Sequence, residues 1–332
     1  MSPWTDDTLR IPALDGFELA ATLYEPERGG ENGVAVLVSS ATAVRRGYYD
    51  GFARHLADQG FSVLTYDYRG IGGSRPRSLA GFKARMRQWG QQDLAGILEW
   101  TAGHLRPRKL LVVGHSVGGQ IVGLAENNER IDGLLAVASQ SGYWGHWPSP
   151  TRYDIALRWF VLVPLLTRLY GYLPGKFGTK EDLPGGVARE WARWGRRSDY
   201  LFEEALRAGF ERFRKPILAY SFADDPYAPR AAVEGLLDFY SEADVTHRHI
   251  FPADVAVDEI GHFGFFRDRF RETLWKDAAA WLRKMSAPGV QTPHRGVSLL
   301  RGEKAVRGVA RKGGTAQPGV STPGVRTPSA AV

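Results

Sequence analysis

Residues 109–121 read Lys-Leu-Leu-Val-Val-Gly-His-Ser-Val-Gly-Gly-Gln-Ile, and they constrain the fold of this chain more than any other stretch. A leucine- and valine-rich run ends at Gly114, and a run compatible with a helix follows Gly118. A strand that turns sharply into a helix needs residues without side chains at the turn, and these glycines supply them. The pattern predicts an α/β architecture in which Ser116 is held on a strained backbone above the edge of a sheet.

The rest of the chain up to about residue 285 alternates short apolar runs with longer amphipathic stretches. Short, nearly continuous apolar strands separated by helices indicate a parallel sheet that is covered on both faces. Before them, residues 13–18 resemble a hairpin in which Asp15-Gly16 supplies the positive φ angles of a type I′ turn. The expected strands are 34–39, 61–66, 109–113, 134–139, 216–221 and 247–251, and the clearest helices are 48–59 and 91–105.

The Gly-x-Ser-x-Gly motif at Gly114–Gly118 is interpreted as the site of a nucleophilic serine. A strand before the motif and a helix after it are the context that such a site requires. The helix that follows directs free N–H groups toward an oxyanion, and the Val117 N–H is the expected first donor. The alternative is a glycine-rich turn that binds phosphate, but the Gly-x-Gly-x-x-Gly spacing of such turns is missing.

Four segments together carry a family resemblance. Gly-His-Ser-Val-Gly-Gly at 114–119 and Asp-Tyr-Arg-Gly-Ile-Gly-Gly-Ser at 67–74 are joined by Gly-Tyr-Leu-Pro-Gly at 171–175 and Gly-His-Phe-Gly-Phe-Phe at 261–266. The sequence resembles serine-nucleophile hydrolases of the α/β-hydrolase superfamily, related to the serine aminopeptidase and lysophospholipase branch, over roughly residues 8–284. The resemblance implies an α/β-hydrolase fold, with a mostly parallel central sheet, helices on both faces and an inserted helical cap.

A serine hydroxyl needs a base, and histidine is the usual base near neutral pH. In this fold the serine, the acid and the histidine follow one another along the chain in that order. His146 comes before any suitable acid, and His247 and His249 alternate on an expected strand, where they fill space. His262 follows that strand between two glycines, which allow a close approach to another loop, so His262 is the predicted base.

The acid is expected just after the strand at 216–221. In the resembled family it precedes a proline by four positions, which fits Asp225 with Pro229. Its neighbour Asp224 stays open as the alternative, because an offset of one residue in a loop is invisible from the sequence; the acid that is not used would hydrogen-bond the loop backbone. Asp258 and Glu259 are weaker candidates.

The second oxyanion donor is expected in the loop after the strand at 34–39. Many relatives carry His-Gly there, whereas this chain has Ser-Ser-Ala-Thr-Ala-Val at 39–44. Any backbone N–H can serve as the donor, and Ala43 is the predicted one, with Thr42 as the alternative. Arg69, together with Asp67, is expected to fix the geometry of a neighbouring loop.

About 75 residues separate Ser139 from the strand at 216–221, far more than an ordinary connection needs. We expect residues 140–212 to form a cap, inserted between the two parts of a core at 1–139 and 213–285. Five of the ten tryptophans lie in this cap. Most of its aromatic side chains are expected to pack the cap onto the core, and Tyr143 and Trp144 are the candidates for lining an apolar substrate pocket.

Composition excludes several classes of protein. There is no cysteine, which rules out disulfide scaffolds, thiolate metal sites and cysteine nucleophiles. Residues 286–332 hold seven basic residues and one acidic residue, and so carry six of the seven net positive charges. We expect this tail to be disordered, and the almost neutral remainder does not indicate a nucleic-acid partner. The apolar run Ile155–Tyr170 is too short and too charged to span a membrane. We expect neither a secretory signal before the core nor a location other than the cytoplasm.

The expected activity is cleavage of a carboxylic ester, with an amide as the alternative bond, in a small or medium apolar acyl substrate. Neither a metal nor a cofactor is required for this chemistry. One rival hypothesis keeps the same three catalytic residues but passes the acyl group to an alcohol or thiol. The other is a non-catalytic member of the fold that binds a ligand, although such members have usually lost one of the three residues, and this chain retains Ser116, His262 and the acid.

Overall fold

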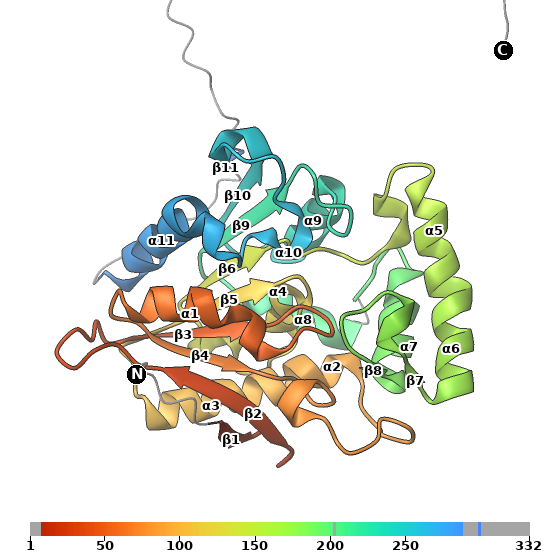
Figure 1. Cartoon of the computed structure of the whole chain (residues 1–332), viewed down its shortest axis with the longest axis horizontal. Helices are drawn as coiled ribbons and strands as arrows, with labels where there is room; N and C mark the ends of the chain where they lie inside the picture. Colours follow the sequence, from red (N-terminus) through yellow and green to blue (C-terminus); the bar gives the residue numbers. More distant parts are fainter. Residues whose placement is uncertain (1–7, 202–203, 288–297, 300–332) are drawn as a thin grey trace, which may run out of the picture. The chain divides into compact units, whose positions relative to one another are not determined.

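The computed structural model describes residues 8–201, 204–287 and 298–299 of the chain. Its central feature is a nine-stranded sheet in the order β1-β2-β4-β3-β5-β6-β9-β10-β11 (Figure 1). β1 pairs antiparallel with β2 and β2 antiparallel with β4, and all the other pairs are parallel. The strands are β1 (Leu9–Pro12), β2 (Glu18–Tyr24), β3 (Val34–Ser39), β4 (Ser62–Tyr66), β5 (Lys109–His115), β6 (Gly133–Val137), β9 (Ile217–Phe222), β10 (Val245–Ile250) and β11 (Ser298–Leu299).

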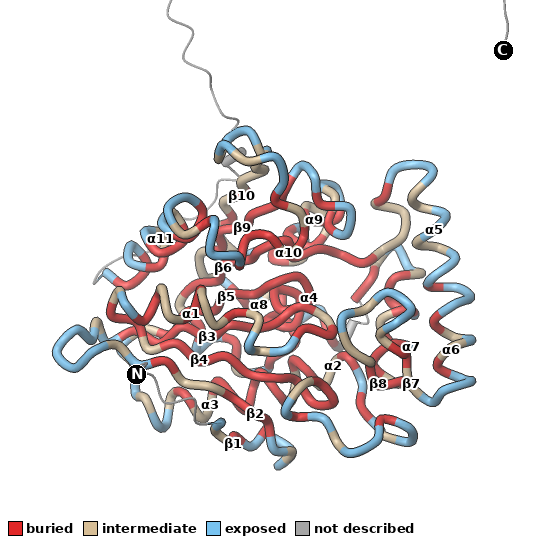
Figure 2. The backbone as a smooth tube through the Cα atoms, viewed as in Figure 1, coloured by how far each residue is buried: buried red, intermediate tan, exposed pale blue. Residues whose placement is uncertain are grey.

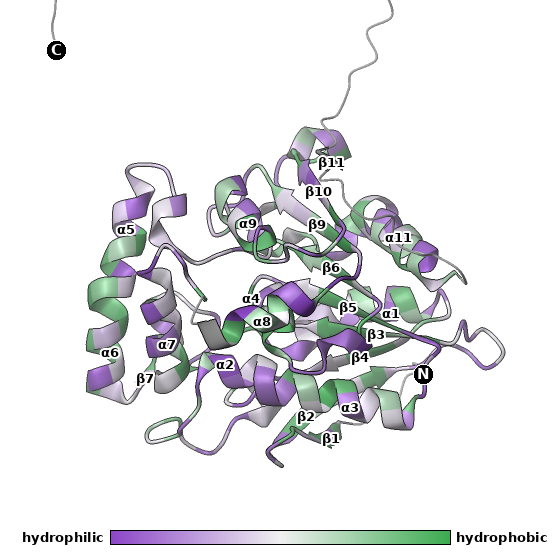
Figure 3. Cartoon of the chain, turned by 180° about the vertical axis from the view of Figure 1, so that it is seen from behind, coloured by the Kyte–Doolittle hydropathy of each residue, from purple (hydrophilic) through white to green (hydrophobic). Residues whose placement is uncertain are grey.

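Helices cover both faces of the sheet, as expected for parallel strands joined by crossovers. α1 and α11 lie in front of the sheet in Figure 1, and α3 and α8 lie in front of it in Figure 3, where the molecule is seen from behind. The α-helices are α1 (Asp50–Ala57), α2 (Met86–Gln88), α3 (Ala95–His104), α4 (Val117–Gln120), α5 (Thr151–Leu157), α6 (Val163–Tyr170), α7 (Gly185–Gly195), α8 (Glu204–Arg212), α9 (Arg230–Leu237), α10 (Gly261–Gly264) and α11 (Lys276–Ser286).

The central strands are buried along their whole length, which is why they read as continuous apolar runs. Every residue of β3, β6 and β9 is buried, and so is β5 from Leu110 onward. Figure 2 shows these strands as the buried centre of the described structure. The fold class predicted from the sequence is confirmed.

The hairpin at the start of the sheet is present, but its turn is not the predicted type I′ turn. β1 and β2 enclose a five-residue loop in which the Gly16 N–H donates to the Ala13 carbonyl at 2.9 Å. Only Gly16 of this loop has a positive φ, at +81°, whereas a type I′ turn also needs a positive φ at Asp15. The Ala13 N–H also donates to the Phe17 carbonyl at 2.8 Å, which leaves three residues inside this pair, one more than a two-residue turn has.

The chain between β6 and β9 forms helices α5 to α8 and a two-stranded sheet of β7 (Tyr172–Leu173) and β8 (Leu183–Pro184). α5, α6 and α7 lie together at one edge of the view in Figure 1. α8 packs on the core instead: Asn128 Nδ2 donates to the Gly209 carbonyl at 2.8 Å, and a Cβ at Gly209 would lie 2.0 Å from the Gly123 carbonyl oxygen. The boundary of the cap at 140–212 stays a prediction.

The expectation of disorder from residue 286 onward is wrong at two places. Ser286 is the last residue of α11, and its carbonyl accepts a hydrogen bond of 2.6 Å from Arg108 Nη1. Ser298–Leu299 forms β11, which pairs in parallel with Thr246 and His247 of β10. The unpaired backbone N–H and C=O groups of an edge strand can pair with a short segment whatever the composition around it. Residues 288–297 and 300–332 lie outside the described residues.

Candidate active site

The candidate nucleophile, Ser116, lies between β5 and α4 with φ +55° and ψ −117°. A positive φ is strained for a residue with a side chain, and such strain is found at functional sites. The Ser116 N–H donates to the Val137 carbonyl at 2.9 Å, which ties the turn to β6. A Cβ at Gly118 would lie 2.1 Å from the Ser39 carbonyl oxygen, so only glycine allows α4 to approach β3 this closely. The sharp turn that the motif predicted is therefore present.

Two backbone N–H groups are predicted from the sequence as oxyanion donors, and the structure describes both segments. Val117 is the first residue of α4, where a helix leaves its N–H groups without intrahelical acceptors. Ala43, in the loop after β3, has φ +57°, a strained backbone that turns the loop next to the end of the strand. The alternative donor, Thr42, precedes it, and the Thr42 Oγ1 atom is buried without a hydrogen-bond partner in the described structure.

The candidate base and acid are joined directly. His262 Nδ1 lies 2.7 Å from Asp225 Oδ2, and both side chains are almost completely buried. The other carboxylate oxygen of Asp225 accepts the N–H groups of Tyr227 at 2.8 Å and Ala228 at 3.0 Å. These bonds fix the orientation of the carboxylate, which in turn fixes the imidazole of His262. No hydrogen bond within the described structure uses the second ring nitrogen of His262, Nε2, which leaves it as a proton acceptor.

Asp224, the alternative acid, has a different role in the structure. Its Oδ2 accepts the N–H groups of Ile260 at 2.7 Å and Gly261 at 3.1 Å. Asp224 therefore holds the backbone that leads into His262, while Asp225 bonds the ring itself. The geometry favours Asp225 as the acid.

The hydroxyl of Ser116 bonds a residue that the sequence analysis did not consider. Ser116 Oγ donates to Gln140 Oε1 at 3.4 Å, and Gln140 Nε2 donates to the Tyr227 carbonyl at 3.3 Å. Gln140 follows β6, and the carboxyl ends of neighbouring parallel strands meet at one edge of a sheet. That rule is a signal in the sequence that could have identified Gln140.

A second overlooked group is His115, which connects three loops at the site. The His262 carbonyl can only accept, so the 2.9 Å bond to His115 Nε2 places the proton of His115 on that nitrogen. His115 Nδ1 then accepts from the Tyr49 hydroxyl at 2.9 Å, and the Tyr49 oxygen accepts the Ala41 N–H at 2.8 Å. Burial, and the nearby His262, hold the pKa of His115 well below its usual value, which keeps the ring neutral as this chain of bonds requires.

The other histidines weighed as the base lie elsewhere. His247 and His249 both bond Ser221 Oγ at 2.7 Å, so they fill the β9–β10 region as expected. Burial lowers the pKa of His247 to about 4. His146 lies against α9, where a Cβ at Gly235 would meet its ring at 2.7 Å.

Arg69 and Asp67 fix loops, but not as a pair. Arg69 bonds Asp15 in the hairpin turn and the buried Asp93, each at 2.7 Å. Asp67 instead accepts the side-chain and backbone N–H groups of Arg46, at 2.5 and 2.7 Å. The two residues thus anchor different loops at the carboxyl end of β4.

The predicted substrate-lining residues, Tyr143 and Trp144, contact other aromatic side chains of the predicted cap. The Tyr143 ring packs edge-on against Trp144 and His146, and Trp144 packs against Phe160. Among the described residues, no ring contact or hydrogen bond joins either side chain to Ser116 or His262. Tyr227 lies closer, with its half-exposed ring centred 5.4 Å from that of His262.

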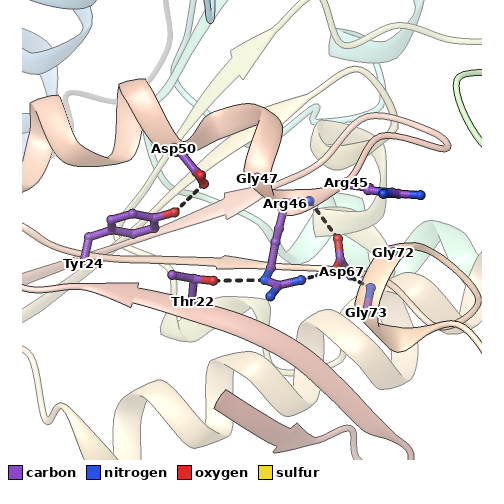
Figure 4. A pocket seen from close by; sticks show the side chains of 9 residues that line it. All are labelled: Thr22, Tyr24, Arg45, Arg46, Gly47, Asp50, Asp67, Gly72 and Gly73. Carbon is purple, nitrogen blue, oxygen red and sulfur yellow. Dashed lines mark hydrogen bonds and ion pairs between the residues drawn. The ribbon is translucent and has the colours of Figure 1, made fainter. Parts of the chain in front are cut away.

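A polar cavity of about 570 Å³ lies between β2, the end of β4 and the loop before α1, and none of the candidate catalytic residues lines it (Figure 4). Thr22, Tyr24, Asp50 and Asp67 line it together with Arg46. Figure 4 shows these polar groups bonded to one another: Arg46 to Thr22 and Asp67, and Tyr24 to Asp50. The polar groups that line the cavity therefore connect loops of the core to one another. In the described part of the chain, no three His, Asp or Glu side chains gather as metal ligands would.

Known proteins are similar to this chain around the candidate nucleophile and in overall fold. The model of the serine aminopeptidase S33 family matches residues 31–181, which include β3 to β6 and Ser116. An uncharacterized protein of Mycobacterium tuberculosis (strain ATCC 25618 / H37Rv) is 36% identical over 119 residues, covering 35% of this chain and 39% of that protein. The chain thus matches only about two fifths of the length of its curated relatives.

Solved structures share the fold along most of the chain. A soluble variant of monoglyceride lipase from Saccharomyces cerevisiae superposes with a TM-score of 0.61 at 15% identity, covering 86% of this chain and 99% of that one. Est1E from Butyrivibrio proteoclasticus gives a TM-score of 0.54 at 16% identity, covering 84% and 98%. With the strained serine turn between β5 and α4 and the family match around it, these likenesses show that the chain has the α/β-hydrolase fold.

Proposed function

We propose that this protein is a serine hydrolase that cleaves carboxylic esters of small or medium apolar acyl groups through an acyl-enzyme on Ser116. The observation that carries the proposal is the 2.7 Å bond between His262 and the buried Asp225, together with a serine on a strained turn whose neighbour His115 bonds the His262 carbonyl at 2.9 Å. The structural neighbours named as a monoglyceride lipase and an esterase domain support an ester as the bond that is cleaved.

In the first step the Ser116 hydroxyl leaves Gln140 and donates to His262 Nε2. The serine oxygen attacks the acyl carbonyl as the imidazole takes its proton, and Asp225 stabilises the imidazolium that results. The Val117 and Ala43 N–H groups accommodate the negative charge on the carbonyl oxygen. His262 then protonates the departing alcohol. A water molecule, activated by the same imidazole, cleaves the acyl-enzyme and restores the serine.

An amide substrate is the second candidate bond, because the matching family model is that of a serine aminopeptidase. The same two steps would release an amine instead of an alcohol. Tyr143 and Trp144 remain the predicted lining of the acyl pocket, and Tyr227 is added to them because of its position beside His262. A cytoplasmic location and the lack of a nucleic-acid partner also remain predictions. Within the described residues, no helix has both the length and the apolar character needed to cross a membrane.

The proposal is tested by labelling the purified protein with a fluorophosphonate probe, alongside Ser116→Ala. We expect labelling of the wild type that disappears in the variant, together with hydrolysis of p-nitrophenyl esters that reaches an optimum at one acyl chain length. A well-folded wild type that is neither labelled nor active on any ester would overturn the proposal. Transfer of the acyl group to an added alcohol in preference to water would identify an acyltransferase.

A further inference from the structure

The helical segment from Thr151 to Tyr170 is apolar on both of its sides. It is formed by α5, a short π-helix at Arg158–Leu162, and α6. Its inner side buries Trp159, Val163 and Thr167. A helix that is apolar all round is usually buried all round. The outer side of this one is instead exposed at every fourth residue: Tyr153, Leu157, Val161, Leu165 and Leu169.

Exposed apolar side chains are concentrated on this part of the molecule. Of the twelve large exposed apolar side chains among the described residues, nine lie between Tyr153 and Phe177. Figure 2 shows the outer side of α5 and α6 as exposed, and Figure 3 shows hydrophobic stretches along the same helices. Contiguous exposed apolar surface of this kind marks an interaction site.

Positive charge surrounds the apolar side. Residues 151–200 contain nine basic and five acidic residues, a net charge of +4, whereas residues 1–285 as a whole have a net charge near +1. Arg158 and Arg168 lie exposed on the segment itself. The Lys176 ammonium lies 5.2 Å from the centre of the Phe177 ring. The positive charge of residues 1–285 is therefore concentrated in the predicted cap and not in the core.

The neighbouring helix α7 extends this positive surface. A hollow of about 400 Å³ is lined by Arg85, Arg189, Arg193 and Arg196, with Glu190 as its one acidic group. The Arg196 guanidinium lies 5.7 Å from the centre of the Phe160 ring, so the hollow adjoins the apolar helix. Guanidinium groups bind phosphate oxygens well, because their planar donors match the geometry of phosphate.

We infer that the outer side of α5–α6, with the arginines that border it, docks on the surface of an anionic phospholipid bilayer. The apolar side chains enter the boundary between the head groups and the acyl chains, while the basic side chains contact lipid phosphates. A second copy of this chain fits the surface less well. A twofold contact brings the same patch of both copies together, and here it would gather Arg158 and Arg168 of one copy and the same two arginines of the other in one interface.

The test is sedimentation of the full-length protein with vesicles of three parts phosphatidylcholine to one part phosphatidylglycerol. We expect the protein to bind these anionic vesicles. Binding should be weaker to vesicles of pure phosphatidylcholine, and weaker at high salt. The variant Leu157→Glu/Leu165→Glu should lower the partition coefficient about tenfold or more. Arg158→Gln/Arg168→Gln should lower it by roughly fivefold per arginine, on the anionic vesicles alone.

A matched control is Leu14→Glu/Phe251→Glu. Leu14 and Phe251 are 51% and 53% exposed, like Leu157 at 50% and Leu165 at 49%, but they lie outside the cap. This control should bind vesicles as the wild type does, and circular dichroism and thermal unfolding should show that both double variants are folded. Neither measurement depends on the chemistry of Ser116, so failure here is distinct from failure of the proposed hydrolase.

Three results would overturn the inference. The first is a wild type that does not bind anionic vesicles. The second is binding that survives Leu157→Glu/Leu165→Glu, which would assign it to the basic residues of the tail at 301–326. The third is a dimer in solution that Leu165→Glu converts to a monomer, which would make a second copy the partner of this surface.

Discussion

Removal of one buried hydroxyl, in Tyr49→Phe, tests whether the bonds through His115 position the site. The Tyr49 oxygen accepts the Ala41 N–H at 2.8 Å, and its proton is donated to His115 Nδ1 at 2.9 Å. Tyr49 itself is fully buried, so water cannot replace the hydroxyl without a rearrangement. Phenylalanine keeps the ring that packs against Tyr48 and Phe266 and leaves both polar groups without a partner.

The expected loss of stability follows from these two orphaned groups. A buried donor or acceptor that loses its partner costs about 1–3 kcal/mol, so the free energy of unfolding should fall by about 2–6 kcal/mol. Domains have a free energy of unfolding of about 5–15 kcal/mol, which exceeds this loss over most of its range, so we expect the variant to be folded at room temperature. Complete loss of an oxyanion donor costs about 10²–10³ in kcat. Ala41 lies two residues before Ala43, the predicted oxyanion donor. Loss of the hydrogen bond that holds the Ala41 N–H should therefore shift this donor and lower kcat by roughly tenfold, with a smaller change in KM.

The assay combines urea unfolding with kinetics on a p-nitrophenyl ester, and its control is Tyr240→Phe. The Tyr240 hydroxyl is equally buried, donates to the Gly119 carbonyl at 2.7 Å and accepts the Gly123 N–H at 3.1 Å, so this change also orphans one donor and one acceptor. We expect similar losses of stability in the two variants but a clearly larger loss of kcat in Tyr49→Phe. Equal losses of kcat, or an unchanged kcat in Tyr49→Phe, would refute the positioning role.

Three further predictions concern single side chains. Asp225→Asn should lower kcat/KM by about 10³–10⁴, because an amide that donates to His262 Nδ1 would place the ring proton on Nε2. Asp224→Asn keeps an acceptor for the loop backbone and should lower kcat/KM less than tenfold. The reverse ranking in ester kinetics would contradict the assignment of the acid. Gln140→Ala should leave fluorophosphonate labelling as fast or faster, because the Ser116 hydroxyl loses its resting acceptor, and slower labelling would mean that Gln140 supports the productive position. The pKa of His247 is about 4 in the folded protein against 6.5 for a free side chain, so the unfolded chain binds more protons as the pH falls. The free energy of unfolding should therefore fall by roughly 3 kcal/mol from this residue between pH 7 and pH 4. In urea unfolding, His247→Gln should reduce this dependence on pH, and an unchanged dependence would contradict the prediction.

Patterns along the chain were enough to predict most of the sheet. Continuous apolar runs predicted β3, β5, β6 and β9, because strands buried on both faces carry no polar alternation. The turn at Ser116 was equally local, since the glycines around it are required by contacts within a few residues and with the adjacent strand. The hairpin turn failed as a prediction because its type depends on loop length, which the strand pairing sets.

Motifs along the chain identified Ser116, His262 and two candidate acids, but the way these side chains meet depends on tertiary contacts. Asp225 and Asp224 are neighbours with the same side chain, and only the approach of the loop at 260–262 separates a partner of the imidazole from a partner of its backbone. Gln140 and His115 lie at the site because parallel strands align their carboxyl ends at one edge of the sheet. The register between those strands sets the distances between the side chains. Propensity and spacing are local quantities, whereas the contacts between loops that are distant in sequence exist only once the sheet is assembled.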